Sequence, residues 1–136
     1  MDRKVIPVAD VMEFDYITID GIATVAEALQ QMVEVDAHYV IINKRGPDDE
    51  IGVVLASDIA KQVLAPHRSP ARVNVYEIMA KPVLSVPPSM NIRYCARLFE
   101  RFGISMAPVV EGDEIKGIVT YTELVLKGLV KLDDGD

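Results

Sequence analysis

The chain repeats one pattern, and this repeat limits the folds it can adopt more than any other feature. The first copy runs from about Val8 to Leu64 and the second from about Val75 to Val130. Each copy opens with a short segment that ends in a methionine, Met12 or Met79, and each closes with a segment that starts at a glycine within a strand and leads into a helix. Repeats of this kind stack, bury a common apolar face and leave related clefts at their junction.

Composition excludes several classes of function. With 136 residues the chain suffices for one domain or for two half-domains that share a core. The formal net charge of −7 argues against nucleic-acid binding, which needs an excess of Lys and Arg. No apolar run approaches the length of a membrane span, and the N-terminus resembles no signal peptide, so we expect a cytoplasmic protein without membrane contact. The single cysteine, Cys95, agrees with a reducing compartment.

The first copy has the pattern of strand, helix, two strands and closing helix. Thr24 and Glu27 have the spacing of a capping box at the start of an amphipathic helix, and Ser57 is expected to cap the closing helix. The lead-in Val5–Pro7 is expected to add an edge strand to this copy. The predicted elements are a strand at 17–19, a helix at 24–35, strands at 39–42 and 51–55, and a helix from 57 to about 64.

The second copy repeats this order. Its predicted elements are a strand at 83–86, a helix at 91–102, strands at 108–110 and 115–119, and a helix from 121 to about 130. The mixture of helices and short strands indicates an α/β or α+β class. The expected division is a first motif at 1–66, a linker at 67–74, a second motif at 75–132 and a disordered tail at 133–136. Neither copy has enough apolar face alone, so we expect the pair to fold as one body.

These features together resemble the CBS family, the paired regulatory motif named after cystathionine beta-synthase. The resemblance rests on the Met-ended lead-ins, the Thr-Val-x-Glu-Ala-Leu start at 24–29, the Ile-Ser-x-x-Pro-Val run at 104–109 and the two closing segments. It implies tandem β-α-β-β-α motifs packed sheet to sheet with pseudo-two-fold symmetry. It also implies clefts that hold an adenosine-containing regulatory ligand, such as AMP, ADP, ATP or S-adenosylmethionine, with no obligatory cofactor.

The resemblance implies that, in family members that bind nucleotides, the closing segment binds ribose through an Asp and phosphate through a hydroxyl. Asp58 occupies the ribose position of the first copy, but Leu55 replaces the hydroxyl residue. Thr120 occupies the hydroxyl position of the second copy, but Glu123 replaces the Asp. Leu55 loses one neutral hydrogen bond, on the order of 1 kcal/mol, and Ser57 offers another hydroxyl, whereas Glu123 displaces the carboxylate. We therefore expect Asp58 to be the stronger ribose site.

The resemblance also implies contacts at the ends of the first strands, just before the middle strands and in the second closing segment. Protonation of His38 near its ordinary pKa would make phosphate binding pH-sensitive. These candidate residues are Thr18, Ser85, Ala37, His38, Ser105, Met106 and Thr122.

The same residues also have simpler interpretations. Thr120 and Glu123 have the spacing of a capping box, Asp58 in the first turn of a helix complements its dipole, and His38 packs at a strand start. No nucleophile, base or metal set is recognisable, and Cys95 lies on the apolar stripe of its helix, so an enzyme is not expected. Two functions remain open: a sensor of adenosine-containing ligands, including energy sensing, that signals to an effector protein, and a ligand-free dimeric interaction scaffold.

The two long helices differ in the charge of their outer faces. If two chains pair head to tail, the basic face of one meets the acidic face of the other, so this homodimer is favoured over a head-to-head one. The alternative is a pair of ordinary solvated faces, because surface ion pairs contribute little. The basic face carries Arg93, Arg97 and Arg101, and the acidic one carries Glu27, Gln30, Gln31 and Glu34.

Overall fold

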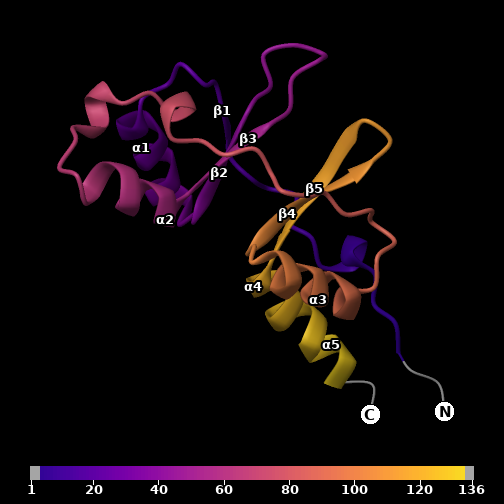
Figure 1. Cartoon of the computed structure of the whole chain (residues 1–136). Coiled ribbons are helices and arrows are strands. Elements are labelled where there is room, and N and C mark those ends of the chain that lie inside the picture. The colour runs from indigo at the N-terminus through magenta and orange to yellow at the C-terminus, as the bar shows by residue number, and fades with distance from the viewer. Residues whose placement is uncertain (1–3, 134–136) are drawn as a thin grey trace. The chain divides into compact units, whose positions relative to one another are not determined.

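The computed structural model describes residues 4–133, which form two compact units (Figure 1). Residues 16–82 form the continuous unit, and residues 4–15 together with 83–133 form the split unit. Each unit has its own sheet, helices and hydrophobic core. Of the tail expected to be disordered, Asp133 ends the last helix, and 134–136 lie outside the described residues.

The continuous unit carries a three-stranded sheet in the order β1-β2-β3, with β1 parallel and β3 antiparallel to β2. Its capping box is confirmed, because Thr24 Oγ1 accepts from the Glu27 N–H at 3.1 Å and Glu27 Oε2 accepts from the Thr24 N–H at 3.2 Å. Its elements are β1 (Thr18–Ile19), α1 (Val25–Val35), β2 (Tyr39–Ile42), β3 (Gly52–Leu55), α2 (Ala56–Ile59), a π-helical continuation (Ala60–Leu64) and 3₁₀ turns at Pro70–Arg72 and Val75–Glu77.

The predicted cap at Ser57 is wrong. Strand β3 runs into α2 without a loop, so Leu55 takes the cap position and Ser57 lies exposed inside the first turn. Leucine has no side-chain acceptor, so no side chain at the cap position accepts from the first-turn N–H groups. Asp58 makes only the returning bond of a capping box, because its Oδ2 accepts a hydrogen bond from the Leu55 N–H at 2.9 Å.

The split unit contains the antiparallel pair β4-β5, joined by a turn in which Gly112 has a φ of 64°. The predicted strand at 83–86 is reduced to one parallel bridge from Val86 to Val109, which takes the place that β1 has in the other unit. Its elements are a 3₁₀ turn (Val8–Asp10), α3 (Ile92–Phe102), β4 (Met106–Glu111), β5 (Glu114–Thr120), α4 (Tyr121–Glu123), a π-helical stretch (Leu124–Leu129) and α5 (Val130–Asp133).

The first lead-in packs on the second copy, which corrects the predicted edge strand at Val5–Pro7. Pro7 forms an antiparallel bridge with Asn91. Further along, the Glu13 N–H donates to the Ile118 carbonyl at 2.7 Å, and the Ile118 N–H donates to the Glu13 carbonyl at 3.0 Å. In Figure 1 the indigo lead-in accordingly runs beside α3. Both sheets offer the same kind of backbone edge, so the residue pattern alone cannot say which edge a lead-in joins.

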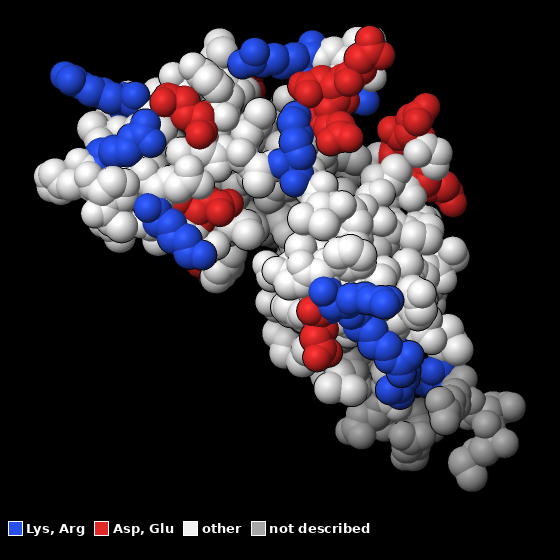
Figure 2. Space-filling model, in the orientation of Figure 1, with Lys and Arg blue, Asp and Glu red and all other residues white. Residues whose placement is uncertain are grey.

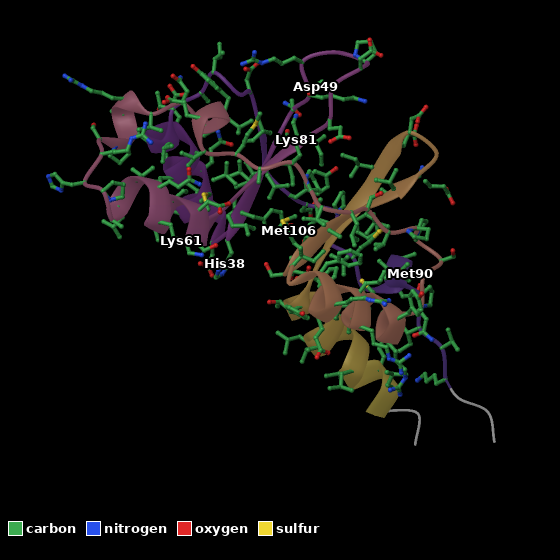
Figure 3. The ribbon with its side chains drawn as sticks, in the orientation of Figure 1. His38, Asp49, Lys61, Lys81, Met90 and Met106 are labelled. Atoms are coloured by element: carbon green, nitrogen blue, oxygen red, sulfur yellow. The ribbon has the colours of Figure 1, made fainter. Side chains whose placement is uncertain are left out.

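The second lead-in makes the equivalent contacts with the first copy. Asn74 bridges Thr24, and Val53 and Ala80 exchange hydrogen bonds of 2.8 and 3.0 Å. Val73, within the stretch expected to be a linker, is only 2% exposed. Just beyond Ala80, the Lys81 ammonium lies 3.0 Å from the Asp49 carboxylate and holds the β2–β3 loop (Figure 3).

The two repeat-marking methionines each pack on a glycine of a closing strand, Gly52 at the start of β3 and Gly117 within β5. A Cβ added at Gly52 would lie 2.5 Å from Met79 Sδ, and one added at Gly117 would lie 2.9 Å from Met12 Sδ. Either Cβ would force neighbouring atoms to shift. The glycines thus let each methionine pack closely on the sheet that its lead-in crosses.

Candidate ligand site

The continuous unit brings four of the predicted site residues together where its sheet meets its closing helix. The Ala56 N–H at the start of α2 donates to the His38 carbonyl at 2.9 Å. This bond places Ala37 and His38, at the entrance to β2, beside Ser57 and Asp58 (Figure 3 labels His38). The side chains of His38 and Ser57 are exposed and those of Ala37 and Asp58 are half-buried, so all four are open to a ligand.

Thr18 belongs to the same sheet but lies further along it. It pairs with Ile41 in the parallel β1-β2 ladder, and its side chain is exposed. The group formed by Thr18, Ala37, His38, Ser57 and Asp58 is called the first half-site below.

The split unit repeats this arrangement with different side chains. The Tyr121 N–H donates to the Ser105 carbonyl at 3.3 Å, and Met106 pairs with Thr120 across β4 and β5. Thr120 Oγ1 accepts from the Thr122 N–H at 3.2 Å and donates to Glu123 Oε1 at 3.0 Å. This second half-site thus contains Ser105, Met106, Thr120, Thr122 and Glu123.

Ser85 is the counterpart of Thr18 in the second half-site. It directly precedes Val86, whose bridge to Val109 joins this segment to β4, and its side chain is exposed. The bonds that the helix starts donate to the His38 and Ser105 carbonyls were not predicted, because a backbone carbonyl leaves no trace in the residue pattern.

The capping box predicted for Thr120 and Glu123 is confirmed, and Asp58 makes the same contact to the residue that precedes its helix. Glu123 Oε1 accepts from the Thr120 N–H at 2.9 Å, which matches the 2.9 Å bond from the Leu55 N–H to Asp58. The extra methylene of Glu123 therefore does not prevent the same backbone contact. In each carboxylate, one oxygen accepts this backbone hydrogen bond. The ligand roles of Asp58 and Glu123 stay predictions.

The two carboxylates differ in burial. Glu123 is 9% exposed and is the one charged side chain that is buried among the described residues, whereas Asp58 is half-buried. Burial raises the pKa of Glu123, and the negative charge of Glu13 adds to this, while the hydrogen bonds from Thr120 and the charge of Lys127 oppose it. Asp58 is thus the more accessible hydrogen-bond acceptor.

Cys95 lies in the core, as its place on the apolar stripe predicted. Its side chain is fully buried, and burial raises the pKa of the thiol to about 11, which keeps it protonated and unreactive. Within residues 4–133, no cluster of three His, Cys, Asp or Glu side chains has the arrangement of a metal site. In the same part of the chain, no helix combines the length and apolarity needed to cross a membrane.

The fold and the paired half-sites define an α+β protein built from two β-α-β-β-α repeats with exchanged lead-ins. The CBS domain family model matches residues 8–65 and 75–129. The chain therefore belongs to the CBS domain family.

Solved structures of CBS proteins resemble the chain, and it also matches curated proteins in sequence. A hexameric CBS-CP12 protein from bloom-forming cyanobacteria is 36% identical with a TM-score of 0.87, covering 94% of this chain and 75% of that one. A CBS domain pair solved in complex with 5′-methylthioadenosine and S-adenosyl-L-methionine is 22% identical with a TM-score of 0.75, covering 97% of this chain and 98% of that one. An uncharacterized protein of Methanopyrus kandleri is 28% identical over 122 residues, and the match covers 88% of this chain but only 61% of that relative.

Proposed function

We propose that this CBS pair is a regulatory module in the cytoplasm that binds an adenosine-containing ligand between its motifs and signals its occupancy to an effector protein. The observation that carries the proposal is the pair of matching half-sites. In each, a carboxylate at the third position of the closing helix accompanies an exposed residue just before the middle strand, His38 in one copy and Ser105 in the other. The related domain pair in complex with 5′-methylthioadenosine and S-adenosyl-L-methionine supports this ligand class.

Such a ligand acts as a signal if it stabilises one arrangement of the motifs over another. The role is regulatory and not catalytic. A carboxylate suits ribose because it accepts hydrogen bonds from both hydroxyls of the diol. Candidate ligands are AMP, ADP, ATP and S-adenosylmethionine.

A binding screen tests the proposal. Isothermal calorimetry and thermal unfolding are measured with each of these ligands and with 5′-methylthioadenosine. A ligand at a hundred times its dissociation constant adds about 2.7 kcal/mol to the free energy of unfolding. If none of them binds, the alternative function is favoured: an interaction scaffold in which Asp58 and Glu123 serve only as caps, which their hydrogen bonds already allow.

The ranking of the half-sites gives the first mutational prediction. Asp58→Ala and Glu123→Ala each remove an equivalent hydrogen bond at the start of a closing helix. Each is therefore expected to lower the free energy of unfolding by about 1 kcal/mol, which makes the two variants a matched pair. Because Asp58 is the more exposed carboxylate, its replacement is expected to weaken ligand binding about tenfold, as loss of a charge-assisted hydrogen bond does. Calorimetric titration of both variants checks this, and a greater loss in Glu123→Ala contradicts the ranking.

We propose further that the chain forms a homodimer through its helical faces, oriented head to tail. Figure 2 shows Lys and Arg side chains gathered over α3, the helix of Arg93, Arg97 and Arg101. Large exposed apolar side chains accompany the helices, with Val33 of α1 79% exposed and Leu126 of the closing helix 65% exposed. A dimer formed through the helices would cover side chains of this kind.

Charge reversal tests the orientation. Arg101 and Glu34 occupy the last turn of α3 and of α1, respectively. Arg101→Glu is expected to weaken the dimer by a few-fold, since an exposed ion pair contributes about 0.2–1 kcal/mol, and adding Glu34→Arg is expected to restore it. Sedimentation velocity measures the dissociation constant. If the double variant is weaker than either single variant, the two faces do not meet.

A further inference from the structure

The N-terminal end of α3 borders a cavity of about 430 Å³ whose charged side chains are all basic. Lys4 comes from the lead-in, and Arg93 and Arg97 come from the first two turns of the helix. Tyr94, which is 55% exposed, adds an aromatic wall. Among the described residues, no carboxylate lines the cavity, although the chain as a whole has a net charge of −7. A site of this composition favours an anion.

The three cations are not neutralised within the described part of the chain. The ion pairs found there join Arg68 to Glu77, Lys81 to Asp49 and Lys116 to Glu114. The Lys4 ammonium instead donates to the carbonyl of Lys131 at 2.7 Å, which holds it in place without cancelling its charge.

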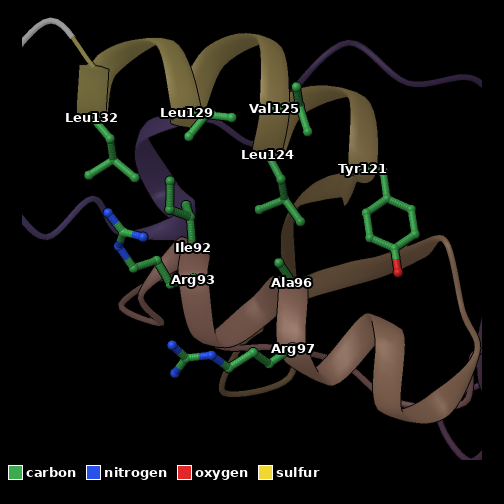
Figure 4. A pocket seen from close by; sticks show the side chains of 9 residues that line it. All are labelled: Ile92, Arg93, Ala96, Arg97, Tyr121, Leu124, Val125, Leu129 and Leu132. Atoms are coloured by element: carbon green, nitrogen blue, oxygen red, sulfur yellow. The ribbon is translucent and has the colours of Figure 1, made fainter.

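The two arginines are also positioned by the helix. Because they are four residues apart, they lie on the same side of α3, and Figure 4 shows both guanidinium groups extending from that side. They also line a second cavity of about 290 Å³, in which their neighbours are mostly apolar side chains such as Ile92, Leu124 and Leu129. The two arginines thus line both this mostly apolar cavity and the basic cavity.

We propose that this cavity is an anion site that binds a small phosphate compound with at least two negative charges. Guanidinium groups bind phosphate oxygens with two parallel hydrogen bonds, and Lys4 supplies a third positive charge. The backbone N–H groups of Ile92 and Arg93 already donate to the Ile6 carbonyl and to Asn91 Oδ1, so the side chains carry the site. The cavity belongs to the split unit alone and is separate from both half-sites, so it does not rest on the proposed adenosine-ligand binding. Arg93 and Arg97 are shared with the basic face proposed for the dimer, so an anion bound here and a partner chain would compete for them.

The test uses the full chain and inorganic pyrophosphate as the probe. Arg93→Gln and Arg97→Gln each remove one charge from the cavity. Arg72→Gln is the matched control, because Arg72 is exposed, belongs to the continuous unit and lies outside the cavity. Calorimetry is expected to show about tenfold weaker pyrophosphate binding for each cavity variant, as loss of a charge-assisted hydrogen bond predicts, and less than twofold change for the control.

Two further measurements separate this site from the alternatives. 5′-Methylthioadenosine has no phosphate, so its dissociation constant is expected to be the same for the wild type and all three variants. If it does not bind at all, that result contradicts only the proposed adenosine-ligand function. The proposal is overturned if pyrophosphate does not bind the wild type, or if Arg72→Gln weakens it as much as the cavity variants. It is also overturned if Arg93→Gln and Arg97→Gln alter the oligomeric state by light scattering but leave pyrophosphate binding unchanged.

Discussion

At the scale of single residues, Glu123 both caps a helix and has a raised pKa. Its carboxylate caps the closing helix through the Thr120 N–H, yet it is nearly fully buried. Burial raises its pKa because the charged form loses hydration. Asp58 makes the equivalent bond in a more open environment. The two copies therefore share the cap and differ in how accessible it is.

The raised pKa of Glu123 predicts a dependence of stability on pH. A carboxyl group with a higher pKa in the folded state stabilises the fold below its unfolded value of 4.5, and this benefit is lost as pH rises through the folded pKa. Glu123→Gln keeps an oxygen acceptor for the Thr120 N–H but carries no charge. The free energy of unfolding of the wild type is thus expected to fall, relative to this variant, between pH 4.5 and pH 7.

Urea unfolding at both pH values measures this difference. Glu27→Gln is the matched control, because Glu27 occupies the same position in the capping box of α1 but has an exposed side chain. If Glu27→Gln and Glu123→Gln change with pH in the same way, burial of Glu123 is not the cause.

At the scale of elements, the fold depends on how closely each lead-in approaches a strand. At Gly117 an added Cβ would lie 2.8 Å from the carbonyl oxygen of Glu13 and 2.9 Å from two atoms of Met12. A backbone atom cannot move aside as a side chain can, so this contact permits only glycine. The same lead-in also accepts the first helical N–H of α3, because the Ile92 N–H donates to the Ile6 carbonyl at 2.9 Å.

Gly117→Ala is accordingly expected to destabilise the protein by about 1–3 kcal/mol, as overpacking of a close contact does. Gly46→Ala is the control, since a Cβ at Gly46 meets nothing within 4 Å. Denaturant unfolding of both variants gives the comparison. If the two variants are equally stable, the lead-in does not pack closely against β5 at Gly117.

At the scale of the whole molecule, the exchange of lead-ins makes each unit a product of both copies. Val8 begins the first copy but is fully buried in the core of the split unit, and Val75 begins the second copy but is fully buried in the core of the continuous unit. Neither sequence copy, cut at its own boundaries, therefore contains a complete core.

The exchange predicts crossed effects of matched core substitutions. Val8→Ala and Val75→Ala each remove two buried methyl groups. Each substitution is expected to lower the free energy of unfolding by about 2 kcal/mol. Hydrogen exchange measured by mass spectrometry is expected to speed up in α3, β4 and β5 for Val8→Ala, and in α1, β2 and β3 for Val75→Ala. The opposite assignment would show that each lead-in serves its own copy.

Much of the local structure was predictable, because its causes lie within a few residues. The capping box of Thr24 and the apolar stripe after it are local signals, and α1 follows them. The strand at 39–42 is confirmed in full for the same reason. The strand at 108–110 extends to Met106–Glu111, because the antiparallel partner β5 continues the ladder past the apolar residues that were recognised.

The sequence by itself determined the repeat, the order of its elements, the family and the positions that carry polar side chains in each closing segment. These follow from periodicity, capping chemistry and motif spacing, which act over short stretches of chain. Only the tertiary structure decided which sheet each lead-in joins, that Glu123 is buried while Asp58 is not, and that Lys4 lines the same cavity as Arg93 and Arg97. Those outcomes depend on contacts between segments far apart in the chain, where two similar copies offer nearly equivalent partners and packing chooses between them.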